Sequence, residues 1–310
     1  MSAFSFKDIL HTKQFSRKDL ELIFETAQDM EKIISWERPG KLLDGKIMAS
    51  LFYEPSTRTR LSFESAMKRL GGEVITVSDG NTSSLSKWET LEDNAMINAI
   101  YSDILVMRHP EAGSVERTAN VIKKPVINAG DGPNQHPTQA LLDVYTIQKE
   151  RWRLDTLHIT IVWDLKYGRT THSLCFLMGL FRDIRFTFIS PKELKMPEKV
   201  TDFLKEKDIP YQETENYEEW IKDADVLYVT RLQKERFTDM SEYEALKGRF
   251  ILTLDILKHA KTDITIMHPL PRVNEVDIAV DSLPNAAFFR QAENGVPIRM
   301  ALLYLLLGKK

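Results

Sequence analysis

The chain has 310 residues, of which 43% are hydrophobic and 28% charged, and its formal net charge is −3. This length is typical of two domains, and this composition is that of an ordinary globular protein with a sizeable core. The acidic balance, without a contiguous basic face, argues against a nucleic-acid-binding protein. No apolar run reaches the ~18 residues of a membrane span and the N-terminus has no apolar signal segment, so we expect a cytoplasmic protein that contacts no membrane.

The first half of the chain alternates between helical and extended patterns. Ser16 is expected to cap a helix whose apolar stripe comprises Leu20, Ile23, Phe24, Ala27 and Met30. The run from Lys46 to Tyr53 alternates like a buried strand, and Leu61 to Leu70 has helical spacing and ends at two glycines. Further patterns predict a strand at Val74 to Val77, a helix from about Glu89 to Ile100, a strand up to Met107 and a strand at Val126.

One long helix is predicted from His136 to Arg153, where the chain leaves the first domain and enters the second. The second half repeats the alternation, and a strongly apolar helix from Ile298 to Leu307 follows it. The expected fold class is α/β: two doubly wound domains, each with a central parallel sheet flanked by helices, linked by the long interdomain helix. Between the two helices we expect strands at 157–162, 186–189, 226–229 and near Ile251 and Ile264, and helices at 170–181, 197–207 and 217–224.

The segment from Glu54 to Arg60 joins a predicted strand to a predicted helix. The first N–H groups of a helix have no partner within it and carry partial positive charge, so this turn suits a small anion such as phosphate. Hydroxyl groups and a guanidinium flank the turn, whereas the glycine spacings of nucleotide-binding loops are missing from it. The alternative is an ordinary capped helix with basic surface residues.

Five other predicted strands end in similar polar groups, rich in Arg, His, Gln and Thr. In open parallel sheets, ligands bind beyond the carboxyl ends of the strands, so these groups can converge on one site. Taken singly, an arginine at a strand end is more often part of a surface ion pair, and a histidine before a proline is more often a helix cap. The groups are Arg108–Pro110, Asn134–Gln139, Asp164–Arg169, Thr230–Lys234 and His268–Arg272.

Two further features limit the chemistry. The single cysteine, Cys175, lies in an apolar helical run, which indicates a buried hydrophobic side chain rather than a nucleophile. The histidines lack the spacing of a metal site, so neither a metal nor another cofactor is expected. The serine-rich segment from Asp79 to Lys87 has no apolar period and is predicted to be a loop.

Four motifs, in their order and separations, closely resemble the catalytic chains of the aspartate carbamoyltransferase family, and the resemblance runs from about Ser16 to Gly308. The motifs are Ser56–Arg60, His136–Gln139, Asp164–Arg169 and His268–Arg272. The resemblance implies transfer of the carbamoyl group of carbamoyl phosphate to L-aspartate, a step of pyrimidine biosynthesis. It also implies a carbamoyl phosphate-binding domain of residues 1–135 with 292–310, and an aspartate-binding domain of residues 136–291.

The resemblance also assigns residues to each part of the substrates, and arginine suits this task because its planar fork can bond two oxygens at once. Phosphate would be held by Ser56, Thr57, Arg58, Thr59 and Arg108, and the carbonyl oxygen by Thr59, Arg108 and His136. The carbamoyl NH2 would be bonded by Gln139 and by the backbone carbonyl of Leu270, and the aspartate carboxylates by Arg169, Arg231 and Gln233. A cis peptide between Leu270 and Pro271 is implied as well.

In this family a loop from a neighbouring subunit reaches into the active site, and Ser83 and Lys87 match the residues that do so. The resemblance therefore implies a homotrimer with shared sites, because closed cyclic symmetry gives each site one neighbour's loop. It is equally compatible with the presence or absence of a regulatory chain.

Two residues depart from the family pattern. Trp88 and Trp163 stand where the family usually has glycine, and glycine in such turns marks unusual backbone angles or close approach of the chain. An indole cannot occupy the same space as a glycine. A catalytically impaired or non-catalytic homologue that binds anions is therefore one alternative function.

Ornithine carbamoyltransferase is the other alternative, because that family shares the Ser-Thr-Arg-Thr-Arg turn. It generally has a cysteine in the His-Pro-Thr-Gln region and a His-Cys-Leu-Pro segment. Thr138 and Pro269 occupy those positions here, which favours aspartate as the substrate.

Overall fold

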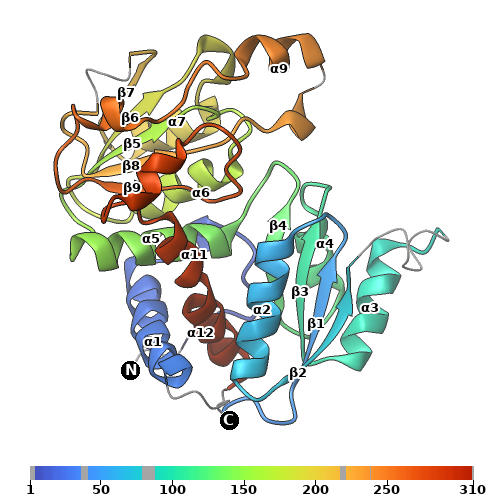
Figure 1. The fold of residues 1–310 in the computed structure, drawn as a ribbon. Helices are drawn as coiled ribbons and strands as arrows, with labels where there is room; N and C mark the ends of the chain where they lie inside the picture. The colour runs from blue at the N-terminus through green and yellow to red at the C-terminus, as the bar shows by residue number, and fades with distance from the viewer. Residues whose placement is uncertain (1–3, 36–40, 79–87, 217–220, 238, 309–310) are drawn as a thin grey trace. The chain divides into compact units, whose positions relative to one another are not determined.

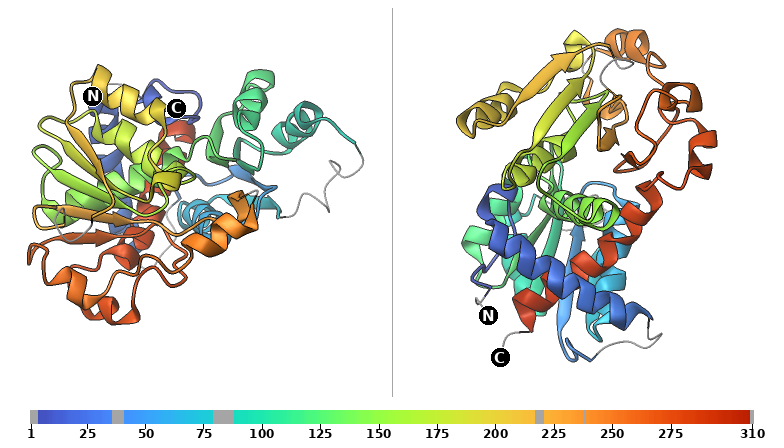
Figure 2. Two further views of the ribbon diagram at one scale, coloured as in Figure 1. Left: turned by 90° about the horizontal axis from the view of Figure 1, so that it is seen from above. Right: turned by 90° about the vertical axis from the view of Figure 1, so that its left-hand side faces the viewer.

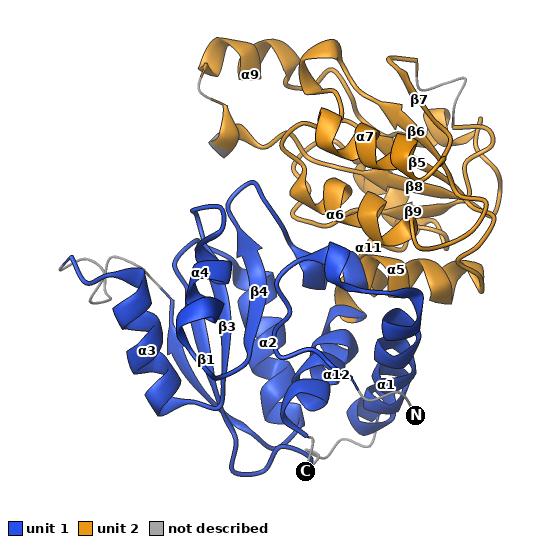
Figure 3. Cartoon of the chain, turned by 180° about the vertical axis from the view of Figure 1, so that it is seen from behind, with its two compact units in different colours: residues 1–141, 294–310 blue, residues 142–293 orange. Residues whose placement is uncertain are grey.

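The computed structural model describes residues 4–35, 41–78, 88–216, 221–237 and 239–308 of the chain. The chain forms two compact units: unit 1 comprises residues 1–141 with 294–310, and unit 2 comprises residues 142–293 (Figure 3). The first boundary falls inside helix α5 (Pro137–Arg151), and the chain returns to unit 1 in helix α12 (Gly295–Leu307). The division into domains after residues 135 and 291 stays a prediction.

Unit 1 is built on a parallel sheet of four strands in the order β2-β1-β3-β4. After β1, helix α2 leads to β2 on one side of β1 in the sheet. Helix α3 then leads to β3 on the other side of β1, and α4 leads onward to β4. Because crossovers between parallel strands are right-handed, this reversal places α2 on one face and α3 and α4 on the other (Figure 1). The elements are β1 (Ile47–Phe52), α2 (Thr57–Arg69), β2 (Glu73–Val77), α3 (Leu91–Tyr101), β3 (Ile104–His109), α4 (Ser114–Val121) and β4 (Val126–Asp131).

Helices α1 (Arg17–Ser35) and α12 belong to the layer that contains α2, and α1 and α12 lie side by side (Figures 1 and 2). The Ser16 backbone N–H and hydroxyl both donate to the Asp19 carboxylate, at 2.8 and 2.6 Å, so the predicted cap is confirmed. The buried side chains of α1 are those of the predicted stripe: Leu20, Ile23, Phe24, Ala27 and Met30. Helix α12 is apolar nearly all round because it contacts both α1 and α2.

Unit 2 contains a parallel sheet of five strands in the order β7-β6-β5-β8-β9. Helices α6 and α7 pack against each other in the β5–α6–β6–α7–β7 half, and one apolar core joins β5, β8 and β9 to the segment around Val280. The strands are β5 (His158–Val162), β6 (Arg185–Ile189), β7 (Tyr211–Thr214), β8 (Val226–Val229) and β9 (Thr265–Met267). The helices are α6 (Arg169–Met178), α7 (Glu198–Glu206), α9 (Met240–Leu246), α10 (Leu254–Leu257) and α11 (Phe288–Glu293).

Most predicted elements are confirmed, but some differ from the structure. The strand expected near Ile251 is wrong, because Leu252 makes only an isolated bridge with Val276 and α10 begins two residues later. The edge strand β7 and the helices α4, α9, α10 and α11 were not predicted. Of the helix predicted at 217–224, residues 217–220 lie outside the described residues and residues 221–224 form a turn. None of the helices in the described part of the chain combines the length and apolar character that a membrane crossing requires.

Candidate active site

Several of the predicted site residues follow the strands at which each sheet reverses its winding. In unit 1 the chain runs from β1 to β2 on one side and to β3 on the other, so the carboxyl ends of β1 and β3 form the switch point. In unit 2 the corresponding strands are β5 and β8. Ligands of open α/β sheets bind beyond the carboxyl ends of strands at such points. Each unit therefore has one candidate half-site, and we describe the two separately.

The first half-site begins with the turn between β1 and α2. Ser56 has extended backbone angles and precedes the helix without a capping hydrogen bond from its side chain. Thr57 and Arg58 are exposed on the first turn of α2, Thr59 is buried, and this turn carries no acidic residue. The first N–H groups of the helix, the hydroxyls and the guanidinium therefore stand together where partial positive charge is greatest, as an anion site requires.

Arg108 lies beside this turn because its residue on β3 pairs with Phe52 at the end of β1. Its backbone carbonyl accepts the N–H of Tyr53 at 2.9 Å. Its guanidinium Nε lies 3.3 Å from Glu54 Oε2, and Nη1 donates to the Ala129 carbonyl at 3.5 Å. The side chain is only 12% exposed. Arg108 is thus a largely desolvated cation whose direction is fixed by groups on both neighbouring strands.

His136 and Gln139 lie at the start of α5, and both are buried. The His136 carbonyl accepts the N–H groups of Gln139 and Ala140, at 3.1 and 3.2 Å, and Pro137 occupies the first helical position, where its missing N–H costs nothing. The His136 backbone therefore starts the helix, and binding of the carbonyl oxygen by its ring stays a prediction.

The turn before His136 is organised by Asp131, a residue that the sequence did not reveal. Its carboxylate is buried and accepts N–H groups from Gly113, Asn128, Asn134 and Gln135 at 2.9 to 3.0 Å. Gly132 has a φ of +53°, and a Cβ there would lie 2.3 Å from the Pro110 carbonyl oxygen. Asp131 thus ties the turn after β4 to the turn after β3. The spacing Asp-Gly before Asn134-Gln135 was the available signal, since aspartate commonly binds backbone N–H groups ahead in such turns.

The second half-site is held together by Asp164, which is fully buried directly beyond β5. Its Oδ1 accepts the N–H of Tyr167 at 3.0 Å, and its Oδ2 accepts the N–H of Gln233 at 3.1 Å. The Thr230 hydroxyl oxygen accepts the Asp164 N–H at 2.8 Å. One carboxylate therefore fixes the loop after β5, which leads to Arg169, against the loop after β8, which carries Arg231 and Gln233.

Arg169 is the first residue of α6 and is buried, although it carries a charge. Gly168 precedes it where a Cβ would lie 2.6 Å from the Asp164 carbonyl oxygen, so only glycine fits between the turn and the helix. The Arg231 Nη1 donates to the Leu232 carbonyl at 3.2 Å, and the Arg231 side chain is half-buried. The structure thus brings Arg169, Arg231 and Gln233 to the adjacent ends of β5 and β8, as a site for carboxylates requires.

His172 binds the backbone of the loop between β5 and α6. Its Nε2 donates to the Leu165 carbonyl at 2.7 Å, and the ring is buried within α6. Burial lowers the pKa of His172 from 6.5 to about 4, against the opposing effect of the Leu165 hydrogen bond, and Lys199 lowers it slightly more. The ring is therefore neutral near pH 7.

This pKa predicts a loss of stability in mild acid. Between pH 6.5 and 4 the unfolded chain binds a proton at residue 172 that the folded chain excludes, so acidification favours unfolding. We expect the free energy of unfolding to fall by about 3 kcal/mol over this range through His172. Denaturant unfolding at a series of pH values measures the slope. The His172→Gln variant, which retains a donor for Leu165, should show a shallower slope, and an unchanged slope would contradict the assignment.

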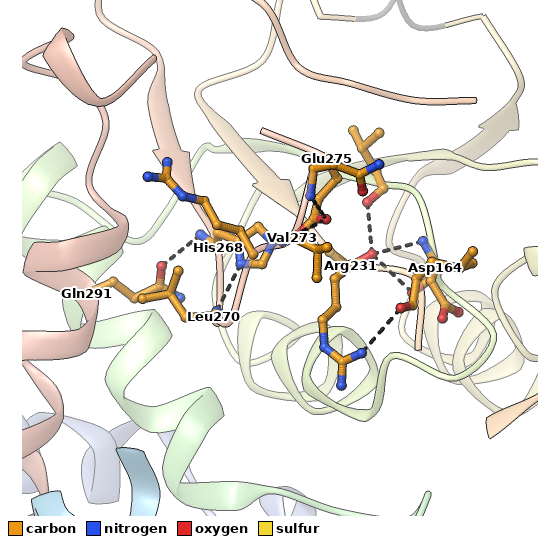
Figure 4. Close-up of polar contacts among 12 residues, drawn as sticks. Asp164, Arg231, His268, Leu270, Val273, Glu275 and Gln291 are labelled. Carbon is orange, nitrogen blue, oxygen red and sulfur yellow. Dashed lines mark hydrogen bonds and ion pairs between the residues drawn. The ribbon is translucent and has the colours of Figure 1, made fainter. Parts of the chain in front are cut away.

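Leu270 lies in a turn that His268 and Glu275 hold in place (Figure 4). The Leu270 N–H donates to His268 Nδ1 at 2.9 Å, so Nδ1 carries no proton and the neutral ring donates from Nε2 to Glu275 Oε1 at 2.8 Å. Glu275 also accepts the N–H groups of Val273 and Asn274. Burial lowers the pKa of His268, which agrees with a neutral ring. The Leu270–Pro271 peptide is cis, as the family resemblance implied.

The same turn is connected to the buried end of β8. Gln291 Oε1 accepts the His268 N–H at 2.9 Å, and Gln291 Nε2 donates to Asp143 Oδ1 at 2.6 Å. The Tyr228 hydroxyl donates to the other carboxylate oxygen of Asp143 at 2.8 Å. These contacts join β8, β9, α5 and α11 within unit 2. Hydrogen bonds thus connect the turn at Leu270 to a buried network that the sequence did not reveal: His268, Glu275, Gln291 and Asp143.

Some predictions fall on parts of the chain that cannot be described. Ser83 and Lys87 lie outside the described residues. Trp88 and Trp163 have φ values of +69° and +96°, which bears out the expectation that these positions need unusual backbone angles. Cys175 is fully buried, and burial raises the pKa of its thiol, so it is no nucleophile. Within the described ranges, no three His, Cys, Asp or Glu side chains are grouped as a metal site would need.

These features define the class of protein: a two-domain α/β enzyme with a candidate site for small anions in each unit. The chain belongs to the aspartate/ornithine carbamoyltransferase family. Residues 7–149 match the family's carbamoyl-P binding domain, and residues 155–306 match its Asp/Orn binding domain.

Relatives and solved structures agree with this family. The aspartate carbamoyltransferase catalytic subunit of Methanocaldococcus jannaschii is 49% identical over 96% of this chain and 96% of its own length. The chloroplastic aspartate carbamoyltransferase of Arabidopsis thaliana is also 49% identical, over 99% of this chain and 79% of its own length. The structure of the Trypanosoma cruzi aspartate transcarbamoylase in complex with carbamoyl phosphate and aspartate has a TM-score of 0.92 and 39% identity, over 97% and 96% of the two chains.

Proposed function

We propose that the chain transfers the carbamoyl group of carbamoyl phosphate to the amine of L-aspartate, giving N-carbamoyl-L-aspartate and phosphate in pyrimidine biosynthesis. The observation that carries the proposal is near-full-length identity of 47–49% to proteins named aspartate carbamoyltransferase. The open helix N-terminus in unit 1 and the paired strand ends with Arg169 and Arg231 in unit 2 support it, because the two substrates bring phosphate and carboxylate groups.

The unit 1 residues would bind carbamoyl phosphate. Ser56, Thr57, Arg58 and Thr59 donate to the phosphate from the first turn of α2, and Arg108 adds a second guanidinium. Thr59, Arg108 and His136 donate to the carbonyl oxygen, and their hydrogen bonds strengthen as that oxygen gains negative charge in the transition state. Gln139 bonds the NH2 group, and the backbone carbonyl of Leu270, a residue of unit 2, is proposed to do so as well. Leu270 depends for its position on the contacts of His268.

The reaction then needs no covalent enzyme intermediate. The neutral amine nitrogen of aspartate attacks the carbonyl carbon, a C–N bond forms, and the C–O bond to phosphate breaks. The amine loses one proton, which the departing phosphate can accept. Arg169, Arg231 and Gln233 orient the amine by holding the aspartate carboxylates, and orientation with charge stabilisation supplies most of the acceleration.

Assembly and location are part of the same proposal. We place Ser83 and Lys87 of one subunit at the active site of its neighbour in a homotrimer, with or without a regulatory chain. Several relatives are catalytic subunits by name, which supports the possibility of a partner chain. The proposed compartment is the cytoplasm, although relatives from plants are chloroplastic.

Product formation with the two competing amines tests the proposal. We expect the purified chain with carbamoyl phosphate to form N-carbamoyl-L-aspartate, and ornithine at equal concentration to give no citrulline. Citrulline formation would instead support the ornithine enzyme. If neither product forms while carbamoyl phosphate still protects the chain from thermal unfolding, the protein is an anion-binding homologue without this activity.

A further inference from the structure

The described tryptophans share a backbone conformation that tryptophan rarely adopts. The chain has five tryptophans, and Trp36 and Trp220 lie outside the described residues. The other three, Trp88, Trp152 and Trp163, have φ values of +69°, +58° and +96°. Positive φ occurs in only a few per cent of residues other than glycine, and bulky side chains are especially rare there. For three independent residues the chance is roughly one in 10,000 or less.

These φ values are those of glycine. The glycines with positive φ in this structure range from +53° at Gly132 to +119° at Gly130, and all three tryptophans fall within that range. Four other described residues that are not glycine have positive φ: Asp183 and Asp208, whose residue type tolerates the left-handed region, and Thr156 and Leu270. Among the residues that the structure describes, Trp163 has the largest φ of any that is not glycine.

Two of the three tryptophan side chains are almost fully exposed in the single chain. Trp88 is 96% exposed and Trp152 is 90% exposed, whereas tryptophan is on average highly buried. Trp152 directly follows the last residue of α5, where a left-handed residue ends many helices and glycine is usual. Trp88 lies in a turn two residues before Thr90, which caps α3. Within the single chain, neither indole is buried against other side chains.

Trp163 differs because its ring is 5% exposed and packs 5.9 Å from Phe250, centroid to centroid. Its backbone N–H donates to the Ile189 carbonyl at 2.9 Å, and the next residue is Asp164. The backbone hydrogen bond to Ile189 therefore helps to hold residue 163 at a φ value suited to glycine. Packing of the ring offsets part of the resulting strain.

We infer that positions 88, 152 and 163 carry glycine in the protein that is translated in its native cells. One codon accounts for all three positions, because UGA is read as tryptophan in some genetic codes and as glycine in others. The gene would then have UGA at these positions, and a chain made with tryptophan would carry three strained residues. The inference does not depend on which reaction the protein catalyses.

The codons and the masses of two peptides test the inference directly. We expect UGA at positions 88, 152 and 163 of the gene. In the protein isolated from its native cells, the tryptic peptides 88–108 and 154–166 should each be lighter by the difference between tryptophan and glycine. UGG codons at these positions, or peptides with the mass of tryptophan, would overturn the inference.

Stability measurements on the recombinant chain test its physical basis. Trp88→Gly and Trp152→Gly are each expected to raise the unfolding midpoint by about 2–4 °C over the matched Trp88→Ala and Trp152→Ala variants. Alanine also removes the exposed indole but keeps the Cβ that makes positive φ unfavourable. Equal midpoints for glycine and alanine at both positions would show that neither backbone site prefers glycine, which would overturn the inference.

Discussion

Replacing Arg58 by alanine is expected to lower kcat/KM for carbamoyl phosphate by about 10²–10⁴, because two charge-assisted hydrogen bonds to phosphate would be lost at about 1.5–3 kcal/mol each. Arg58 is exposed on the first turn of α2, so its loss should leave the fold intact. Steady-state kinetics at saturating aspartate, with the unfolding midpoint measured in parallel, separate a loss of function from a loss of structure.

Arg60 is the matched control, since it is a second arginine two residues further along α2. Its Nη1 lies 3.8 Å from Glu64 Oε1, one turn ahead on the same helix. Such a pair contributes only about 0.3–0.5 kcal/mol, so Arg60→Ala should change kcat/KM by no more than about threefold. Equal losses in both variants would mean that general positive charge, rather than the position of Arg58, attracts the substrate.

The sequence predicted the parts of the fold that depend on local periodicity. The stripe of α1 appeared in full because apolar residues at helical spacing must face a core. Edge strand β7 (Tyr211–Thr214) was missed because its side chains are only half-buried, which removes the alternation that marks a strand. The strand predicted near Ile251 is absent for the opposite reason. This segment has the apolar residues of a buried strand, but it forms only the isolated bridge of Leu252 with Val276.

In the candidate site, too, the residues that follow local patterns were predictable and those with distant partners were not. Groups at strand ends, such as Arg108 and Arg169, were predictable because parallel sheets place those ends at one edge. The residues that hold them were not, because their partners are distant in sequence. Asp143 and Gln291 are 148 positions apart, yet they share a hydrogen bond of 2.6 Å. The local sequence does not mark such a pair, because an aspartate has the same one-letter code whether its carboxylate is buried or exposed.

The second large effect concerns Glu275, whose removal is expected to destabilise unit 2. Burial raises the pKa of Glu275, but the hydrogen bonds from His268 and the backbone outweigh this and leave the pKa below its ordinary value, so the group is a carboxylate near pH 7. Glu275→Ala would leave the buried His268 Nε2–H without an acceptor and release the turn at Val273. We expect a loss of about 3 kcal/mol in the free energy of unfolding and a midpoint lower by about 6–12 °C.

Two variants distinguish this buried acceptor from an ordinary charge. Glu275→Gln keeps a carbonyl oxygen for His268 and should recover at least half of the lost stability. Asp281→Ala removes a carboxylate that pairs with Arg272 nearer the surface, so it should cost no more than about 1 kcal/mol. Because the His268 ring also holds the Leu270 N–H, Glu275→Ala should lower kcat more than Asp281→Ala does at a temperature where both variants are folded. If Glu275→Ala and Asp281→Ala had the same midpoint and the same kcat, the turn at Leu270 would be held by its backbone alone, and the proposed positioning role of His268 and Glu275 would be wrong.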